Sequence, residues 1–129
     1  MLLAAADRSD PDHTACRELL ETHSGPLVTT ALVIAESGWL IDRQLGPSAE
    51  AALYESAAGG EIRVEPLSAA DWARIAALTI QYADQDLGGV DSSLIAVAER
   101  LGVSSIGTLD RRHFGVVRPQ HIASFELLP

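Results

Sequence analysis

Three acidic residues fall where the sequence predicts the ends of strands or the first turns of helices. Glu36 lies early in an expected helix over residues 31–45, Asp91 opens a helix after an acidic loop, and Asp110 directly follows an expected strand over residues 103–109. Carboxylates that are brought together repel one another and raise one another's pKa, so such clusters usually hold a cation. Oxygen ligands select hard ions, so the three acids could converge as a site for Mg²⁺ or Mn²⁺.

A site of that kind favours the hydrolysis of a phosphodiester. The ion lowers the pKa of a water molecule, orients it for attack and neutralises charge on the transition-state oxygens. Thr108 could add a hydroxyl ligand or orient the water. Arg111, Arg112 and Arg118 place three of the nine basic residues near the expected site, where they could hold RNA phosphates through paired contacts.

Each of these residues also has a purely structural interpretation. Asp91 could be the N-cap of its helix, and Asp110 could be a turn acid that pairs with the next arginines. Glu36 lies on a helix that is expected to be buried on several sides, where an unpaired carboxylate is expensive, so it could pair with an arginine. The arginines that follow Asp110 could equally belong to a solvated turn.

Hydrophobic periodicity and the positions of glycine and proline predict the elements that must position these side chains. Ser68 and Asp71 have the spacing of a capping box, and Gly102 suits the end of the helix that Asp91 opens. The expected helices cover residues 10–24, 31–45, 49–58 with Ser48 as cap, 68–82 and 91–101, and the expected strands cover residues 27–30, 62–64, 103–109 and 122–128.

Strands that alternate with helices indicate βαβ units. The sequence therefore predicts an α/β fold of three layers, α/β/α, with a mostly parallel sheet flanked by helices. No linker or repeat divides the chain, so we expect a single domain over residues 1–129. Ligands of such sheets bind outside the carboxyl ends of the strands, which is where the acids fall.

The composition excludes several classes of function. The chain has 129 residues and a net charge of −9, which argues against non-specific binding of nucleic acid unless a cation or a basic partner changes the local potential. All nine basic residues are arginines, which excludes mechanisms that need a lysine. The single cysteine, Cys16, is expected in the core, and the lack of disulfides and of a signal peptide predicts a cytoplasmic protein.

Two segments carry a resemblance to a known family. Residues 90–102 read VDSSLIAVAERLG and residues 107–114 read GTLDRRHF, and both closely resemble the C-terminal half of PIN-domain ribonucleases of the VapC toxin type. Residues 29–36, TTALVIAE, resemble the second motif of that family. The similarity covers nearly the whole chain.

The resemblance implies a PIN domain that acts as a Mg²⁺- or Mn²⁺-dependent endoribonuclease, with Glu36, Asp91 and Asp110 as catalytic metal ligands. It also implies a homodimer and a VapB-type antitoxin that silences the enzyme. The antitoxin would bind a helix pair that presents Trp39, Ile41 and Leu45, although core packing is the default for apolar residues. A basic antitoxin would suit the acidic surface.

The sequence departs from the family at its N-terminus. Members of the family begin with a strand that ends in an aspartate, the first metal ligand, whereas residues 1–6, MLLAAA, match only the segment after that aspartate. We expect the natural start to lie upstream of Met1, because the loss of a central strand would expose its neighbours. The alternative is a shortened, catalytically impaired module that only binds an antitoxin.

The remaining features point less clearly to a function. His13, His23, His113 and His121 show no ligand spacing and are expected at the surface or at helix caps, although His113 could touch substrate because it lies near Asp110. A signalling domain with a phosphorylated strand-end aspartate is a weaker alternative, since the chain has no lysine to pair with the phosphate.

Overall fold

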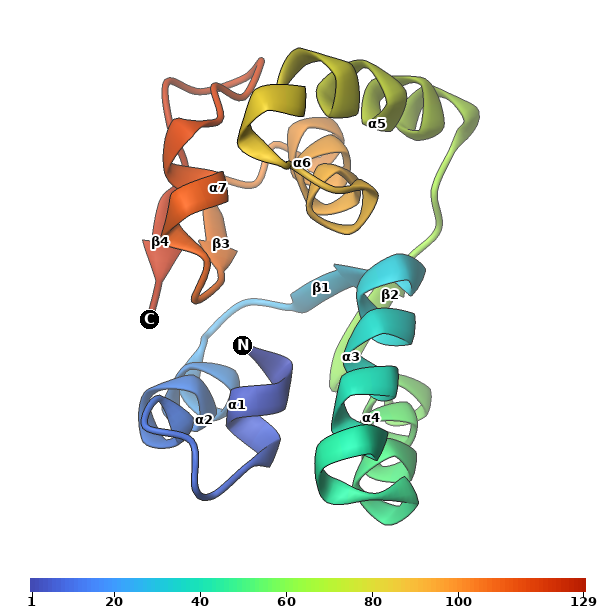
Figure 1. Cartoon of the computed structure of the whole chain (residues 1–129), viewed down its shortest axis with the longest axis vertical. Coiled ribbons are helices and arrows are strands. Elements are labelled where there is room, and N and C mark those ends of the chain that lie inside the picture. The colour runs from blue at the N-terminus through green and yellow to red at the C-terminus, as the bar shows by residue number, and fades with distance from the viewer. The chain divides into compact units, whose positions relative to one another are not determined.

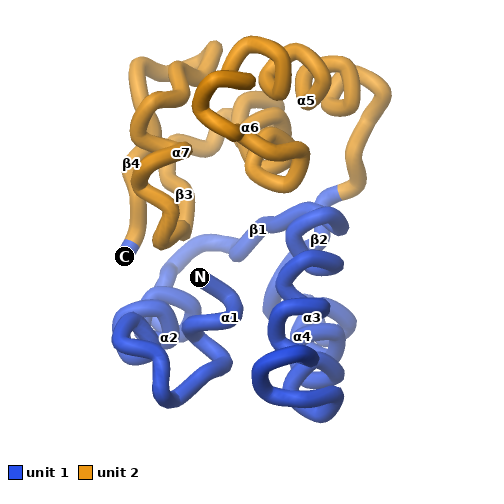
Figure 2. The backbone as a smooth tube through the Cα atoms, viewed as in Figure 1, with its two compact units in different colours: residues 1–65, 129 blue, residues 66–128 orange.

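The computed structural model describes all 129 residues and divides into two compact units. Unit 1 comprises residues 1–65 with Pro129, and unit 2 comprises residues 66–128 (Figure 2). The expectation of a single domain over residues 1–129 stays a prediction. Each unit has its own helices, its own parallel strand pair and its own hydrophobic core, and the two are described in turn.

In unit 1 a pair of helices precedes each of the two strands (Figure 1). They are α1 (Leu2–Ala6), α2 (His13–Thr22), β1 (Leu27–Thr30), α3 (Ala31–Leu45), α4 (Pro47–Gly59) and β2 (Ile62–Glu65). Those of unit 2 are α5 (Ala69–Gln81), a 3₁₀ turn η1 (Ala83–Gln85), α6 (Gly89–Leu101), β3 (Ser105–Gly107), α7 (Arg111–Val116) and β4 (Glu126–Leu128).

In unit 1 the chain passes from strand to helix without a loop. Thr30 is the last residue of β1, and its hydroxyl accepts the backbone N–H of Val33 at 3.4 Å, which caps α3. The chain then returns through α4 to β2, which pairs with β1 in parallel, Leu27 opposite Ile62. A core of Ile41, Leu53 and Ile62 joins α3, α4 and β2, and a separate small core of Ala4, Ala5 and Cys16 joins α1 to α2.

Two helix starts in unit 1 differ from the prediction. The N-cap of α4 is Gly46 at φ +86°, with Pro47 as the first helical residue, so Ser48 is not the cap. This start is favoured because proline has no N–H to leave unpaired and its φ already suits a helix. The helix expected from residue 10 begins at His13, because Asp10 instead accepts the N–H of Asp12 in a turn.

Unit 2 packs two long helices against a short parallel pair of strands. β3 and β4 align in parallel, with Ile106 opposite Leu127. Both are shorter than the runs that the sequence predicts, because residues 103–104, 108–109 and 122–125 lie outside the ladder. The core of the unit is formed by Leu78, Leu87, Ile95, Ala98, Ile106, Phe114, Val117 and Phe125.

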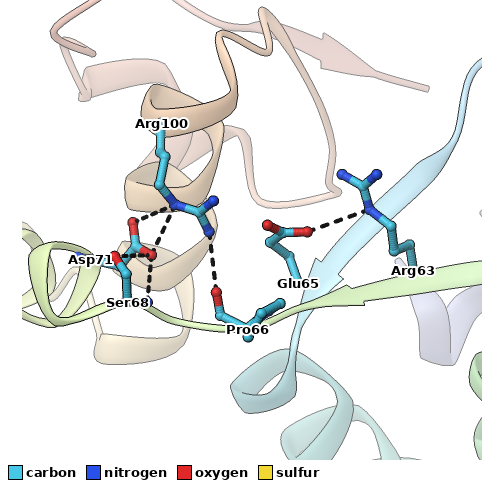
Figure 3. Close-up of polar contacts among 6 residues, drawn as sticks. All are labelled: Arg63, Glu65, Pro66, Ser68, Asp71 and Arg100. Carbon is cyan, nitrogen blue, oxygen red and sulfur yellow. Dashed lines mark hydrogen bonds and ion pairs between the residues drawn. The ribbon is translucent and has the colours of Figure 1, made fainter.

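Polar and charged side chains connect the start of α5 to the end of α6 (Figure 3). The predicted capping box is confirmed, since the Ser68 hydroxyl accepts the N–H of Asp71 at 3.2 Å while the Asp71 carboxylate accepts the N–H of Ser68 at 2.8 Å. Arg100 of α6 donates to both oxygens of the same carboxylate, at 3.1 and 3.0 Å, and to the carbonyl of Pro66 at 3.1 Å. The end of α6 is therefore tied to the start of α5.

The observed elements confirm the α/β class, since every strand pair is parallel and helices lie between the strands in the chain. The strands form two separate pairs, β1 with β2 and β3 with β4. Cys16 is fully buried, as predicted for a core residue. No helix has the length and apolar character that crossing a membrane requires.

Candidate metal centre

Two acids and a histidine meet at one point of unit 2. The ligand atoms of Asp91, Asp110 and His113 all lie within 4.8 Å of one another. Asp91 comes from the first turn of α6, while Asp110 and His113 come from the start of α7. The cluster therefore joins residues that are about twenty positions apart in the chain, and it depends on how α6 and α7 pack around the shared core.

Asp91 is the third residue of α6, and Gly88 is the N-cap. The interpretation of Asp91 as a cap is therefore wrong, because the helix begins two residues earlier, at Gly89. The buried side of α6 includes Ser92, Ser93, Ile95 and Ala96, which fix the rotation of the helix. This rotation directs the Asp91 carboxylate, which is 28% exposed, towards His113.

Asp110 is held in place by the turn that precedes it. The Thr108 hydroxyl accepts the N–H of Asp110 at 3.0 Å, and the Thr108 N–H donates to the carbonyl of Leu128 in β4 at 2.7 Å. The Asp110 carboxylate then caps α7 by accepting the backbone N–H of His113 at 2.9 Å. Thr108 is buried and acts on the turn that presents Asp110.

His113 contacts both carboxylates through one ring nitrogen. Its Nδ1 lies 2.9 Å from Oδ2 of Asp110 and 3.3 Å from Oδ2 of Asp91. That nitrogen is buried, yet it makes no hydrogen bond of acceptable geometry. The pairing of Asp110 with an arginine, which the sequence left open, is replaced by this contact with His113.

The electrostatics of the cluster act against the charged form of Asp91. Burial raises the pKa of the Asp91 carboxyl, and the nearby Asp110 charge raises it further. His113 acts in the opposite direction, through its charge and its contact with the carboxylate, but the pKa of Asp91 remains raised. A carboxyl whose pKa is raised by burial and by a neighbouring acid marks a candidate functional site.

Glu36 lies in unit 1 and is exposed. The expectation that its helix surrounds it with apolar residues is wrong, because the buried positions of α3 are Gly38 and Ile41. Position 36 falls on a different face of the helix from both, since it is two and five residues away from them. The structure contains no ion pair between Glu36 and an arginine. Its convergence with Asp91 and Asp110 stays a prediction.

The arginines proposed to bind RNA differ in their contacts. Arg111 and Arg112 are exposed in the first turn of α7, next to Asp110. The Arg118 guanidinium donates instead to the carbonyls of Gly115 and Val117, at 3.2 and 3.1 Å, so it closes the end of α7. The binding of substrate by Thr108, Arg111 and Arg112 stays a prediction.

The residues proposed to bind an antitoxin lie on different faces of α3. Trp39 is 56% exposed, and the Arg43 guanidinium stacks over its ring at 4.8 Å. Ile41 is 1% exposed and belongs to the core with Leu53, while Leu45 packs against the same core. Ile41 therefore supports the helix pair from within, and the binding of an antitoxin by Trp39, Ile41 and Leu45 stays a prediction.

His113 is the residue of the cluster that the sequence did not assign to a metal site. The signal was present, because residues three apart face the same side of a helix and His113 follows Asp110 at that spacing. The spacing became informative only with the start of α7 known, since Asp110 is its cap and His113 lies in its first turn.

Comparisons with known proteins agree with this fold. The family model described as "PIN domain" matches residues 1–118. "Ribonuclease VapC26" of Mycobacterium tuberculosis is 34% identical over 128 residues, which cover 99% of this chain and 95% of the relative. VapC20 of Mycobacterium tuberculosis, described as a sarcin–ricin loop cleaving toxin, shares the fold with a TM-score of 0.73 at 21% identity, over 81% of this chain and 80% of that one.

A parallel α/β fold with an acidic cluster beside its strand ends defines the class of protein. The chain belongs to the PIN-domain family and, within it, to the VapC type of ribonuclease. The relationship to a VapC ribonuclease over nearly the full length supports cleavage of RNA as its activity.

Proposed function

We propose that the protein is a metal-dependent endoribonuclease toxin that cleaves a specific RNA and is neutralised by a cognate VapB-type antitoxin. The observation that carries the proposal is the meeting of Asp91, Asp110 and His113 within 4.8 Å, in a chain related to a ribonuclease along its whole length. Asp91, Asp110 and Glu36 are the proposed metal ligands, with Mg²⁺ or Mn²⁺ as the ion.

The residues of the cluster fit a divalent ion. Two carboxylates with one imidazole nitrogen are a donor set for a small divalent metal. Burial and the Asp110 charge raise the pKa of Asp91, which supports a cation beside its ionised carboxylate. When it is bound, the ion supplies an activated water and charge neutralisation at the scissile phosphate.

The chain's own residues position that chemistry. The packed face of α6 fixes Asp91, while Thr108 and the cap of α7 fix Asp110, so neither carboxylate depends on a flexible loop end. Arg111 and Arg112 are exposed beside Asp110, and their positive charges would attract a phosphate backbone to the site. They would offset locally the net charge of −9 that otherwise repels RNA.

The proposed partners follow from the class. A VapB-type antitoxin with basic character would complement the acidic chain, and exposed Trp39 with Arg43 stacked on it offers a contact on α3. We further propose a homodimer that acts in the cytoplasm.

Cleavage tests the proposal directly. The chain is incubated with a pool of RNA hairpins, including the sarcin–ricin loop that the description of VapC20 names, with Mn²⁺, with Mg²⁺ and with chelator. We expect cleavage that chelator stops and that Asp91→Asn lowers by at least about 100-fold, because a metal ligand is lost. Asp84→Asn, an exposed acid of η1, is the matched control and should cleave normally.

Two results would contradict the proposal. Cleavage that survives both chelator and Asp91→Asn would remove the cluster from the mechanism. A folded protein that binds a VapB-type antitoxin but cleaves none of the RNAs with either ion would favour the alternative, a catalytically impaired antitoxin-binding module.

A further inference from the structure

The contact between His113 and the two carboxylates has an unusual feature. Nδ1 of His113 is buried and contacts oxygens of both Asp110 and Asp91, at 2.9 and 3.3 Å, but neither contact has the angles of a well-formed hydrogen bond. A buried polar atom without a partner costs about 1–3 kcal/mol and calls for an explanation. The nitrogen faces one oxygen of each carboxylate, so a cation placed between the three atoms would contact all of them.

The backbone holds the imidazole in this position. Asp110 accepts the N–H of His113 at 2.9 Å, and Phe114, the next residue of α7, is buried in the core of unit 2. The ring therefore cannot leave the carboxylates without a change of side-chain rotamer. His113 is therefore held next to two carboxylates without a well-formed hydrogen bond to either. A ligand of a metal ion would be placed in this way.

The distances suit a metal ion. In octahedral coordination with bonds of about 2.1 Å, neighbouring donor atoms are about 3 Å apart. The two separations from Nδ1, 2.9 and 3.3 Å, lie close to that value. A cation shared by Nδ1 and the two carboxylates would satisfy the buried nitrogen and reduce the repulsion between the acids.

We propose that Nδ1 of His113 is a nitrogen ligand of the ion held by Asp91 and Asp110, and that it makes the site prefer Mn²⁺ to Mg²⁺. Mg²⁺ takes oxygen ligands and keeps its waters, whereas imidazole binds first-row transition ions more strongly. The inference rests on the proposed function, because it concerns the same metal site. It adds the identity of a ligand and the choice of metal.

A spectroscopic measurement tests the ligand directly. Mn²⁺ is added to the full chain, and pulsed electron paramagnetic resonance detects nitrogen bound to the ion. We expect coupling to one nitrogen in the unsubstituted protein and none in His113→Asp, which keeps an oxygen ligand at the same place. An acidic residue is also favourable in the first turn of α7, so the variant should fold.

Two controls make the result specific. His23→Asp, at an exposed position of unit 1, should keep the nitrogen coupling, which excludes a surface histidine as its source. His113→Asn, which removes the imidazole without adding a charge, should lose it. Calorimetric titrations should show the ratio of Mn²⁺ to Mg²⁺ affinity falling about tenfold or more in His113→Asp, as expected for the loss of a ligand.

The outcomes separate this inference from the proposed function. Mn²⁺ that binds to the unsubstituted protein and not to Asp91→Asn, but shows no nitrogen coupling, would overturn the role of His113 and leave the metal site intact. An unchanged ratio of Mn²⁺ to Mg²⁺ affinity in His113→Asp would also overturn that role. Failure of the unsubstituted protein to bind either ion would overturn the metal site itself and the inference with it.

Discussion

Arg74 and Glu99 form a two-pronged ion pair between α5 and α6, with Nε and Nη2 of the arginine donating to the carboxylate at 2.7 and 2.9 Å. Glu99 also accepts the backbone N–H of Gln120 at 2.9 Å, so one carboxylate connects α5, α6 and the segment before β4. The same helix α6 carries Asp91 in its first turn. The position of Asp91 beside Asp110 and His113 therefore depends on this pair as well as on the apolar core.

Glu99→Gln should destabilise the protein by about 3 kcal/mol, because it leaves the largely buried Arg74 without its charge partner. Chemical unfolding at neutral pH measures the change. Glu21→Gln is the control, since it breaks an exposed pair with Arg17 within α2, and it should cost about 0.5 kcal/mol or less. Equal losses in the two variants would show that burial does not strengthen the Arg74 pair.

Stability should fall in acid through Asp71 and Glu99. Burial acts to raise the pKa of each carboxyl, but hydrogen bonds from Ser68 and Arg100 to Asp71, and from Arg74 and Gln120 to Glu99, leave both values lowered. The unfolded chain then binds more protons than the folded one around pH 4. The stabilisation is complete above the unfolded pKa values and is lost as the pH falls through the folded ones.

Unfolding measured between pH 7 and pH 2 tests this dependence. Asp71→Ala removes the capping box and the Arg100 pair, so it should cost about 2 kcal/mol at pH 7 and much less at pH 2. Asp84→Ala, in the exposed turn η1, should change stability by about 0.5 kcal/mol at most. A loss from Asp71→Ala that is the same at both pH values would contradict the role of its charge.

Asp91→Asn should raise the melting temperature of the metal-free protein. The pKa of Asp91 is raised by burial, so its contribution to stability is present below the unfolded value of 3.8 and is lost as the pH rises through the folded value. At neutral pH the ionised carboxylate is therefore destabilising, and asparagine removes that charge. The measurement is thermal unfolding with chelator.

Added Mn²⁺ should reverse the order of the two proteins. A ligand that binds only the folded state stabilises it. Once the ligand concentration exceeds Kd, this stabilisation grows with the logarithm of that concentration. We expect the melting temperature of the unsubstituted protein to rise with Mn²⁺ and that of Asp91→Asn to stay unchanged. An equal rise in both would place the ion away from Asp91.

Gly38→Ala should destabilise the packing of α3 on α4. A methyl group at Gly38 would lie 2.5 Å from the Tyr54 hydroxyl and 3.1 Å from the ring carbon that carries it. The clash should cost about 1–3 kcal/mol and replacing a helical glycine should gain about 1 kcal/mol, so we expect a net loss of up to about 2 kcal/mol. Gly59→Ala in α4 has open space around it and should show only the gain.

A second background tests the cause of the Gly38 effect. In a Tyr54→Ala protein the obstructing ring is gone, so Gly38→Ala should become stabilising. Chemical unfolding of the four proteins in this cycle gives the coupling between the two positions. A loss that is equally large without Tyr54 would mean that another neighbour limits the space at Gly38.

The sequence determined the bounds of several elements and the class of protein. The bounds of β1 and α3 agree with the prediction, because a β-prone run changes to helical periodicity at Thr30 and a glycine follows Leu45. The capping box at Ser68 and the helix end at Gly102 also agree, since both depend on side chains within one turn. Local interactions of this kind can be read from spacing alone, and the family motifs at residues 29–36, 90–102 and 107–114 are local too.

Tertiary structure decided what the local pattern could not. That Asp91 is not the cap of α6 depended on where this helix begins, and the partner of Asp110 depended on the packing of α7 against α6. The inclusion of His113 has the same origin, since its ring reaches Asp91 only across that packed interface. The structure also showed that Trp39 is exposed and Ile41 is buried. The sequence could not show this, because solvent exposure depends on neighbours that lie far away in the sequence.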